Sequence, residues 1–103
     1  MTAATQKKVL EKQFDALSEI LISKGHDYAS NTDVLKVFKQ VGGILHRSPT
    51  EICLVFITTK ILRLQNLLSD EEKNPNHESI RDNVRDLQGY SLLLEQLMVE
   101  DYA

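Results

Sequence analysis

The sequence predicts an all-α protein, a compact bundle of about four helices with the third helix at its centre. Two observations support this prediction. Apolar residues recur at helical spacing in four successive segments, and no segment alternates apolar and polar residues as a half-buried strand would. Because the connections between the segments are short, residues 1–103 are expected to form a single helical domain.

The first helix is expected from about Thr5 to Lys24, where Gly25 is a residue type that often ends a helix. A loop is then expected over residues 26–32. The apolar face of this helix is formed by Leu10, Phe14, Leu17 and Leu21.

The second helix is expected to be short and to end near Leu45, with Asn31, Thr32 or Asp33 as its N-terminal cap. Gly42 and Gly43 stand side by side near its end. Two adjacent glycines weaken a helix, and they also permit a bend or a close approach between backbones.

The third helix has the clearest start signal in the chain. Ser48 at the cap, Pro49 at the first helical position and Glu51 at the third form a capping box. The helix is expected to continue to about Leu68. Since its first half is apolar nearly all round, it is predicted to be the central helix.

The fourth helix is expected from about His77 to Val99, after a polar loop over residues 69–76. Its core-facing stripe is predicted to consist of Ile80, Val84, Leu87, Leu94 and Met98. The opposite side becomes apolar toward its end, so it is expected to border a pocket or a partner subunit.

Composition excludes several classes of protein. A formal net charge of -3 and a pI of about 5.5 argue against a general nucleic-acid binder. The single cysteine, Cys53, excludes an internal disulfide and is expected to be a buried hydrophobe. The apolar runs look too short to cross a bilayer, and no signal-peptide pattern is found, so the expected location is the cytoplasm, without membrane partners.

Lys60 and Arg63 are separated by three positions and therefore share a face of the third helix with apolar neighbours. Cations in such a stripe either extend their heads into water, form an internal ion-pair network, or bind an anion. Glu78, Asp82 and Asp86 recur every four residues on the fourth helix. Such a row repels itself, so a positive group is expected to face it: the basic pair, or a divalent metal such as Mg²⁺.

Alternative interpretations stay open for both charged groups and for a third segment. Arg81 and Arg85 beside the acidic row are also consistent with a solvated surface of mixed charge. Residues 24–28, with Lys24, Asp27 and Tyr28, are consistent either with a loop that frames a ligand or with a capped helix end.

Four short motifs resemble a phage and bacterial family, the nucleotide modification associated domain. They are Lys24-Gly25-His26-Asp27-Tyr28, Lys60-x-x-Arg63, Glu78-Ser79-Ile80-Arg81-Asp82 and Asp86-Leu87-x-Gly89-Tyr90. The resemblance covers about residues 20–98 and implies a role in phage nucleotide metabolism or base modification, in the host cytoplasm. The acidic helix is also distantly similar to the all-α nucleoside triphosphate pyrophosphohydrolases, which hold magnesium with Glu-x-x-Glu and Glu-x-x-Asp. Here the carboxylates are instead spaced by four.

The leading hypothesis is a phage-type protein that binds a nucleotide or a related phosphorylated small molecule, for metabolism or to sequester a nucleotide signal. Lys60 and Arg63 would contact phosphates, and Tyr28 or Tyr90 the base. The alternatives are a magnesium-dependent nucleotide pyrophosphohydrolase, with Glu78, Asp82 and Asp86 at the metal, and a protein inhibitor of a host factor. A homo-oligomer is expected because a small domain has a thin core.

Overall fold

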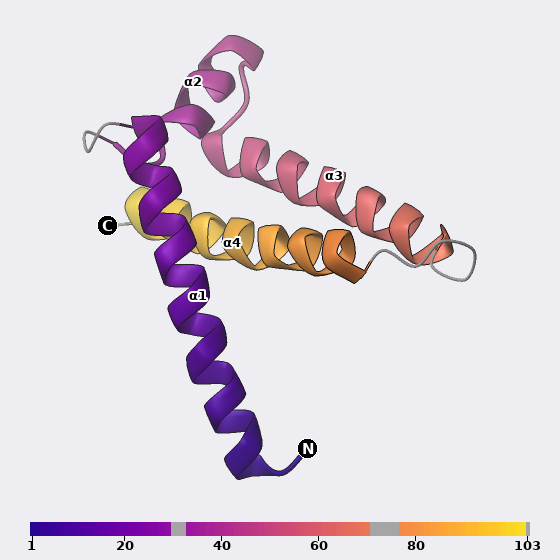
Figure 1. The fold of residues 1–103 in the computed structure, drawn as a ribbon. Helices are drawn as coiled ribbons and strands as arrows, with labels where there is room; N and C mark the ends of the chain where they lie inside the picture. The colour runs from indigo at the N-terminus through magenta and orange to yellow at the C-terminus, as the bar shows by residue number, and fades with distance from the viewer. Residues whose placement is uncertain (30–32, 71–76, 103) are drawn as a thin grey trace. The chain divides into compact units, whose positions relative to one another are not determined.

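The computed structural model describes the backbone of residues 1–29, 33–70 and 77–102, and the side chains of residues 1–23, 33–69 and 79–100. Within these ranges the chain is all-α and contains no strand, as predicted. The four helices are α1 (Ala3–Ala29), α2 (Lys36–Leu45), α3 (Pro49–Asp70) and α4 (His77–Tyr102) (Figure 1).

Helix α1 belongs to one compact unit, Met1–Val34, and the other three helices form a second unit, Leu35–Ala103. The predicted end of the first helix at Lys24 is wrong, since α1 runs through Gly25 to Ala29. A glycine inside a helix costs only about 1 kcal/mol, which is too little to end a helix of this length. Of the predicted loop, residues 26–29 are therefore helical, and residues 30–32 lie outside the described residues.

Helix α2 ends in a tight turn that depends on Gly42. The backbone N–H groups of His46 and Arg47 both donate to the Gly42 carbonyl, and His46 has a left-handed backbone with φ 55°. A Cβ atom on Gly42 would lie 2.6 Å from the Arg47 carbonyl oxygen, whereas one on Gly43 would meet nothing within 4 Å. The close approach expected of the glycine pair is thus found at Gly42. The N-terminal cap position of α2 is Leu35, without a side-chain cap bond, so Asp33 is wrong as a cap candidate. The other two candidates, Asn31 and Thr32, lie outside the described residues.

The capping box at the start of α3 is confirmed. The backbone N–H of Glu51 donates to Ser48 Oγ over 3.1 Å, and the backbone N–H of Ser48 donates to Glu51 Oε1 over 3.2 Å. Each side chain thus satisfies a backbone donor that the first helical turn leaves without an intrahelical partner.

Replacing Ser48 with alanine is expected to lower the free energy of unfolding by about 1 kcal/mol, since the N-terminal cap of α3 is lost. Urea unfolding of the two proteins at neutral pH measures this difference. Ser91→Ala is a suitable control, because Ser91 is an exposed serine inside α4 whose hydroxyl donates to the Leu87 carbonyl oxygen and caps no helix start. A loss for Ser48→Ala no larger than that for Ser91→Ala would contradict the expectation.

The same cap makes the stability depend on pH. The backbone N–H of Ser48, then its hydroxyl, and to a smaller extent the Arg47 charge lower the pKa of Glu51 from its usual value. A lowered folded-state pKa contributes stability above the unfolded-state pKa, and this contribution is lost as the pH falls through the folded value. The stability difference between the wild type and Glu51→Gln should therefore be present at neutral pH and shrink in acid. A difference that does not change with pH would contradict this.

The second unit is built around α3, which contacts both α2 and α4. Its central position is therefore confirmed. In Figure 1, α3 and α4 run side by side in opposite directions. An aromatic chain joins the three helices: the ring centroids of Phe38 and Phe56 lie 5.6 Å apart, and those of Phe56 and Tyr90 lie 5.8 Å apart. The buried core residues beside it are Leu35, Phe38, Ile52, Cys53 and Leu97.

Helix α4 uses a different face for packing than predicted. Val84 and Met98, assigned to the inner stripe, are 39% and 45% exposed, so their assignment is wrong. The core contacts of α4 come from Leu97, Tyr90, Leu93 and Leu94, of which only Leu94 was predicted. The side expected to border a pocket or a partner therefore packs on the core, and this rotation carries the acidic side chains at 82 and 86 toward α3.

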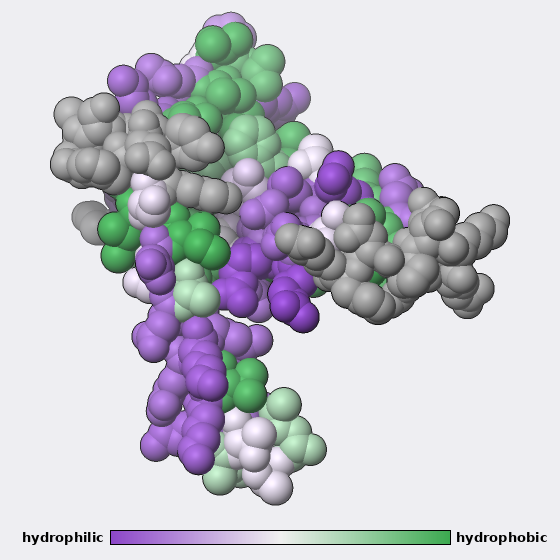
Figure 2. All heavy atoms as spheres, viewed as in Figure 1, coloured by the Kyte–Doolittle hydropathy of each residue, from purple (hydrophilic) through white to green (hydrophobic). Residues whose placement is uncertain are grey.

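Helix α3 also has a large exposed apolar side. Over Pro49–Ser69 it is long and apolar enough to cross a membrane by length and composition, so the expectation that every apolar run is too short was wrong. A core helix of a soluble protein passes the same test, but only 11% of this stretch is buried. Figure 2 shows apolar residues gathered over α2, while hydrophilic residues cover the middle of α4.

Candidate functional site

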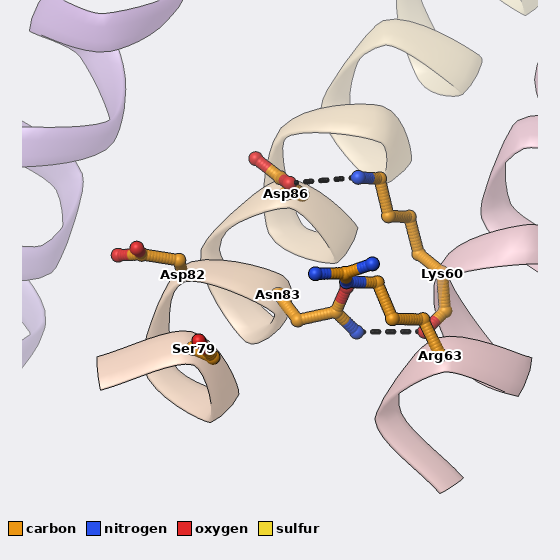
Figure 3. A pocket seen from close by; sticks show the side chains of 6 residues that line it. All are labelled: Lys60, Arg63, Ser79, Asp82, Asn83 and Asp86. Carbon is orange, nitrogen blue, oxygen red and sulfur yellow. Dashed lines mark hydrogen bonds and ion pairs between the residues drawn. The ribbon is translucent and has the colours of Figure 1, made fainter. Parts of the chain in front are cut away.

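A polar recess of about 180 Å³ lies between α3 and α4. Two basic side chains come from α3, and the remaining four side chains come from α4 (Figure 3). Its lining residues are Lys60, Arg63, Ser79, Asp82, Asn83 and Asp86. The structure thus brings together both predicted cations and two of the three carboxylates of the acidic row.

Lys60 and Asp86 form an ion pair across the recess. Lys60 Nζ lies 3.1 Å from Asp86 Oδ2, and the two side chains are 28% and 30% exposed. This pair is partly shielded from solvent, so it is screened less than an ion pair on an open surface. It holds α3 and α4 together and neutralises one of the two cations.

A double-mutant cycle of Lys60→Met and Asp86→Asn is expected to give a coupling free energy of about 1 kcal/mol in urea unfolding, at the upper end of exposed pairs. The control cycle is Arg47 with Glu51, whose charged atoms are 3.7 Å apart and whose side chains are 67% and 55% exposed. The coupling in this control should be smaller. Equal coupling in the two cycles would show that the recess pair gains nothing from its partial burial.

Arg63 occupies a different electrostatic position from Lys60. Its side chain runs from α3 toward α4, and its guanidinium faces the recess (Figure 3). No ion pair joins it to a carboxylate among the described side chains. The guanidinium is therefore the cation of the recess that is available to an anionic ligand.

Asn83 is a recess residue that the sequence reasoning missed. It is 3% exposed, and its Nδ2 donates to the Lys60 carbonyl oxygen over 2.7 Å. Its Oδ1 is buried and has no hydrogen-bond partner among the described residues. The one signal in the sequence that could have pointed to Asn83 is that it directly follows Asp82, a member of the acidic row.

The acidic row is only partly gathered at the recess. Asp82 lines it, but its carboxylate points away from Lys60 (Figure 3). The side chain of Glu78 lies outside the described residues. Among the described side chains, no group of three or more histidine, cysteine or acidic residues is close enough to hold a metal ion. Asp86 is engaged by Lys60, so the described geometry provides one available carboxylate.

Of the other predicted ligand residues, the structure describes the side chain of Tyr90 alone. The side chains of Lys24, Asp27 and Tyr28 lie outside the described residues, although their backbone belongs to α1. The Tyr90 ring packs edge-on against Phe56 in the core. Tyr90 therefore links α4 to α3 and is not part of the recess lining.

Cys53 is buried, as expected. Its side chain is 0% exposed, and Sγ donates to the Tyr90 carbonyl oxygen over 3.4 Å. Burial raises the pKa of this thiol. A thiol held in its protonated form inside the core is a poor nucleophile, so Cys53 is a packing residue.

Comparison with known proteins adds no assignment to this geometry. No protein-family model, characterised protein or solved structure matches the chain.

Proposed function

We propose that the recess between α3 and α4 binds a nucleotide or a related phosphorylated small molecule. The observation that carries this proposal is the Arg63 guanidinium, which faces a polar recess and has no carboxylate partner among the described side chains. A guanidinium binds phosphate oxygens through two parallel hydrogen bonds. Since Lys60 is already paired with Asp86, Arg63 would be the primary phosphate contact and Lys60 a secondary one.

The size and charge of the recess fit a small ligand. Its volume of about 180 Å³ is below the roughly 300–1,000 Å³ of pockets that enclose a whole ligand, so it would hold a phosphate with part of a sugar or a base while the rest extends into solvent. The acidic chain repels long polyanions, so the partner is a small molecule and not general nucleic acid. The resemblance to the nucleotide modification associated domain supports the same ligand class and a cytoplasmic role in phage nucleotide metabolism or in sequestering a nucleotide signal.

Isothermal titration with mono-, tri- and cyclic nucleotides tests this proposal. Saturable binding at micromolar to low millimolar concentration, weakened by high salt, is the expected result. Absence of binding by every nucleotide at millimolar concentration would overturn it.

The same samples distinguish binding from hydrolysis. With Mg²⁺ and a nucleoside triphosphate, a pyrophosphohydrolase would release pyrophosphate and lose this activity in Asp82→Ala. Binding without turnover is expected, because Asp86 is paired with Lys60 and therefore less available to a metal. Turnover that depends on Asp82 and Asp86 would instead establish the enzyme.

We also propose that the chain self-associates through the exposed side of α3. Leu54, Ile61 and Leu68 recur every seven residues on it, are about half exposed, and have Thr58 and Gln65 between them. This stripe contains no charged residue. Leu54 and Leu68 are equally distant from Ile61, so an antiparallel second copy centred on Ile61 would pair Leu54 of one chain with Leu68 of the other, as a two-fold interface requires.

Light scattering at tens of micromolar tests self-association. The wild type is expected to have at least twice the monomer mass, and Ile61→Lys is expected to be monomeric because it places a charge at the centre of the stripe. Ile44→Lys is the control, since Ile44 is 76% exposed on α2 and outside the stripe. A monomeric wild type would contradict the proposal.

A further inference from the structure

We infer that Asn83 selects the ligand of the recess by accepting a hydrogen bond from one of its N–H or O–H groups, while Arg63 binds the adjacent anionic group. This inference rests on the proposed function and specifies its ligand class. Asn83 would thus determine specificity, although the sequence analysis singled out only its neighbours Asp82 and Asp86.

The orientation of the Asn83 amide follows from its one hydrogen bond. Its Nδ2 lies 2.7 Å from the Lys60 carbonyl oxygen. A carbonyl can only accept, so the amide nitrogen must face Lys60 and the amide oxygen must face the other way. Rotating the amide by 180° would bring two acceptors together. The position of Oδ1 is therefore determined by the backbone of α3.

Oδ1 is an unusual acceptor in this environment. Asn83 is 3% exposed, and Oδ1 is buried without a partner among the described residues. A buried acceptor left without a donor costs free energy that a matching donor recovers. Because Asn83 lines the recess, a ligand there is well placed to supply that donor.

Arg63 supplies the second half of the recognition. Its side chain is exposed and faces the same recess from α3 (Figure 3). Because Oδ1 is buried, its use by a ligand requires the Arg63 guanidinium to shift as it binds the phosphate. Binding of the anionic group and recognition of the donor would then be coupled.

The charges of the recess restrict the anionic group further. Lys60 and Asp86 neutralise each other, and Asp82 adds a negative charge at the edge. One unpaired guanidinium offsets the single charge of a phosphodiester and part of the charge of about -1.5 to -2 on a phosphate monoester, whereas a triphosphate would bring still more negative charge toward Asp82. The ligand class is therefore a monophosphate or a phosphodiester that carries an amino or hydroxyl group close to the phosphate-bearing moiety.

The experiment compares nucleotide pairs that differ by one donor, in the full chain. Adenosine 5′-monophosphate is compared with purine riboside 5′-monophosphate, and guanosine 5′-monophosphate with inosine 5′-monophosphate; the second member of each pair lacks the amino group. Each ribonucleotide is also compared with its 2′-deoxy form, which lacks the 2′-hydroxyl group. Titration calorimetry gives the affinity ratio for each pair in the wild type, in Asn83→Ala and in Asn83→Leu. The leucine variant, whose apolar side chain fills the space without offering an acceptor, is included in case the cavity left in Asn83→Ala prevents folding, and circular dichroism checks folding in each case.

For at least one pair, we expect the nucleotide that lacks the donor to bind the wild type about tenfold more weakly, or worse, than its partner. For the Asn83 variants, the two nucleotides of that pair should differ in affinity by less than about twofold. Such a difference in ratios would not arise if Asn83 only stabilised the helix pair. Wild-type binding without donor discrimination, or the same discrimination in the variants, would overturn the inference and leave the proposed function intact. Tighter binding of triphosphates than monophosphates without added cations would overturn the charge argument. No binding by any parent nucleotide would remove both.

Discussion

Replacing Arg63 with alanine is expected to weaken binding of a nucleoside monophosphate about 10- to 100-fold. A hydrogen bond to a charged group contributes about 1.5–3 kcal/mol, and 1.4 kcal/mol corresponds to a factor of ten in affinity. Arg63 is exposed and has no ion-pair partner among the described side chains, so the variant should unfold at nearly the same urea concentration as the wild type. Titration calorimetry at constant ionic strength measures the affinity loss.

Arg81→Ala is the matched control for this experiment. Arg81 is an exposed arginine on α4 that does not line the recess, so its removal changes the net charge equally and should alter the affinity less than about threefold. Arg63→Lys should recover part of the affinity, since lysine keeps the charge but loses the two-pronged geometry. Equal losses in Arg63→Ala and Arg81→Ala would show that only long-range charge matters and would place the ligand elsewhere.

Replacing Gly42 with alanine is expected to lower the free energy of unfolding by about 1–3 kcal/mol, because the new methyl group overpacks the turn after α2. The added Cβ would lie 2.6 Å from the Arg47 carbonyl oxygen, which is a backbone atom and cannot rotate away. The shift needed to relieve the contact also strains the bonds from His46 and Arg47 to the Gly42 carbonyl. Thermal unfolding should show a decrease of several degrees for a domain of this size.

Gly43→Ala is the control for this prediction. It lies in the same helix, and an added Cβ would meet nothing within 4 Å. Since alanine is the better helix former, this variant should be unchanged or up to about 1 kcal/mol more stable. Equal destabilisation of the two variants would mean that any side chain at this end of α2 is harmful and that the contact with Arg47 is not the cause.

Sequence patterns predicted helix boundaries correctly where the hydrogen bonds they imply form within a few residues. The Ser48, Pro49 and Glu51 pattern places the start of α3 correctly because its hydrogen bonds form within one helical turn. The end of α1 was misplaced because a single glycine has a small cost compared with the hydrogen bonds of the helix that continues past it. Propensity at one residue does not decide a boundary in a helix of this length.

The face that α4 turns toward α3 was harder to predict. It carries apolar residues on two sides, and periodicity alone cannot decide which side is packed. In the structure, the side of α4 with Tyr90 and Leu97 packs on the core that α3 helps to form. This choice depends on the neighbouring helix and therefore cannot be made from the sequence of α4 alone. This choice of face also forms the recess, since it places Asp86 opposite Lys60 and buries Asn83 against the Lys60 carbonyl of α3.

The charged residues of the recess were predictable because they lie at helical spacing and need partners of opposite charge. Asn83 was not, because an asparagine between two aspartates usually belongs to a solvated surface. Its importance depends on a tertiary contact, the bond from Nδ2 to the Lys60 carbonyl, which no local pattern reveals.

Titration of a nucleoside monophosphate into ¹⁵N-labelled protein, followed by NMR, tests the central claim most directly. We expect saturable shifts confined to the Asn83 side-chain amide, the Arg63 guanidinium and the backbone around Ser79, Asp82 and Asp86, with the Arg81→Ala variant giving the same pattern. Shifts centred on other residues, or none at millimolar nucleotide, would contradict the claim that α3 and α4 form a ligand-binding recess.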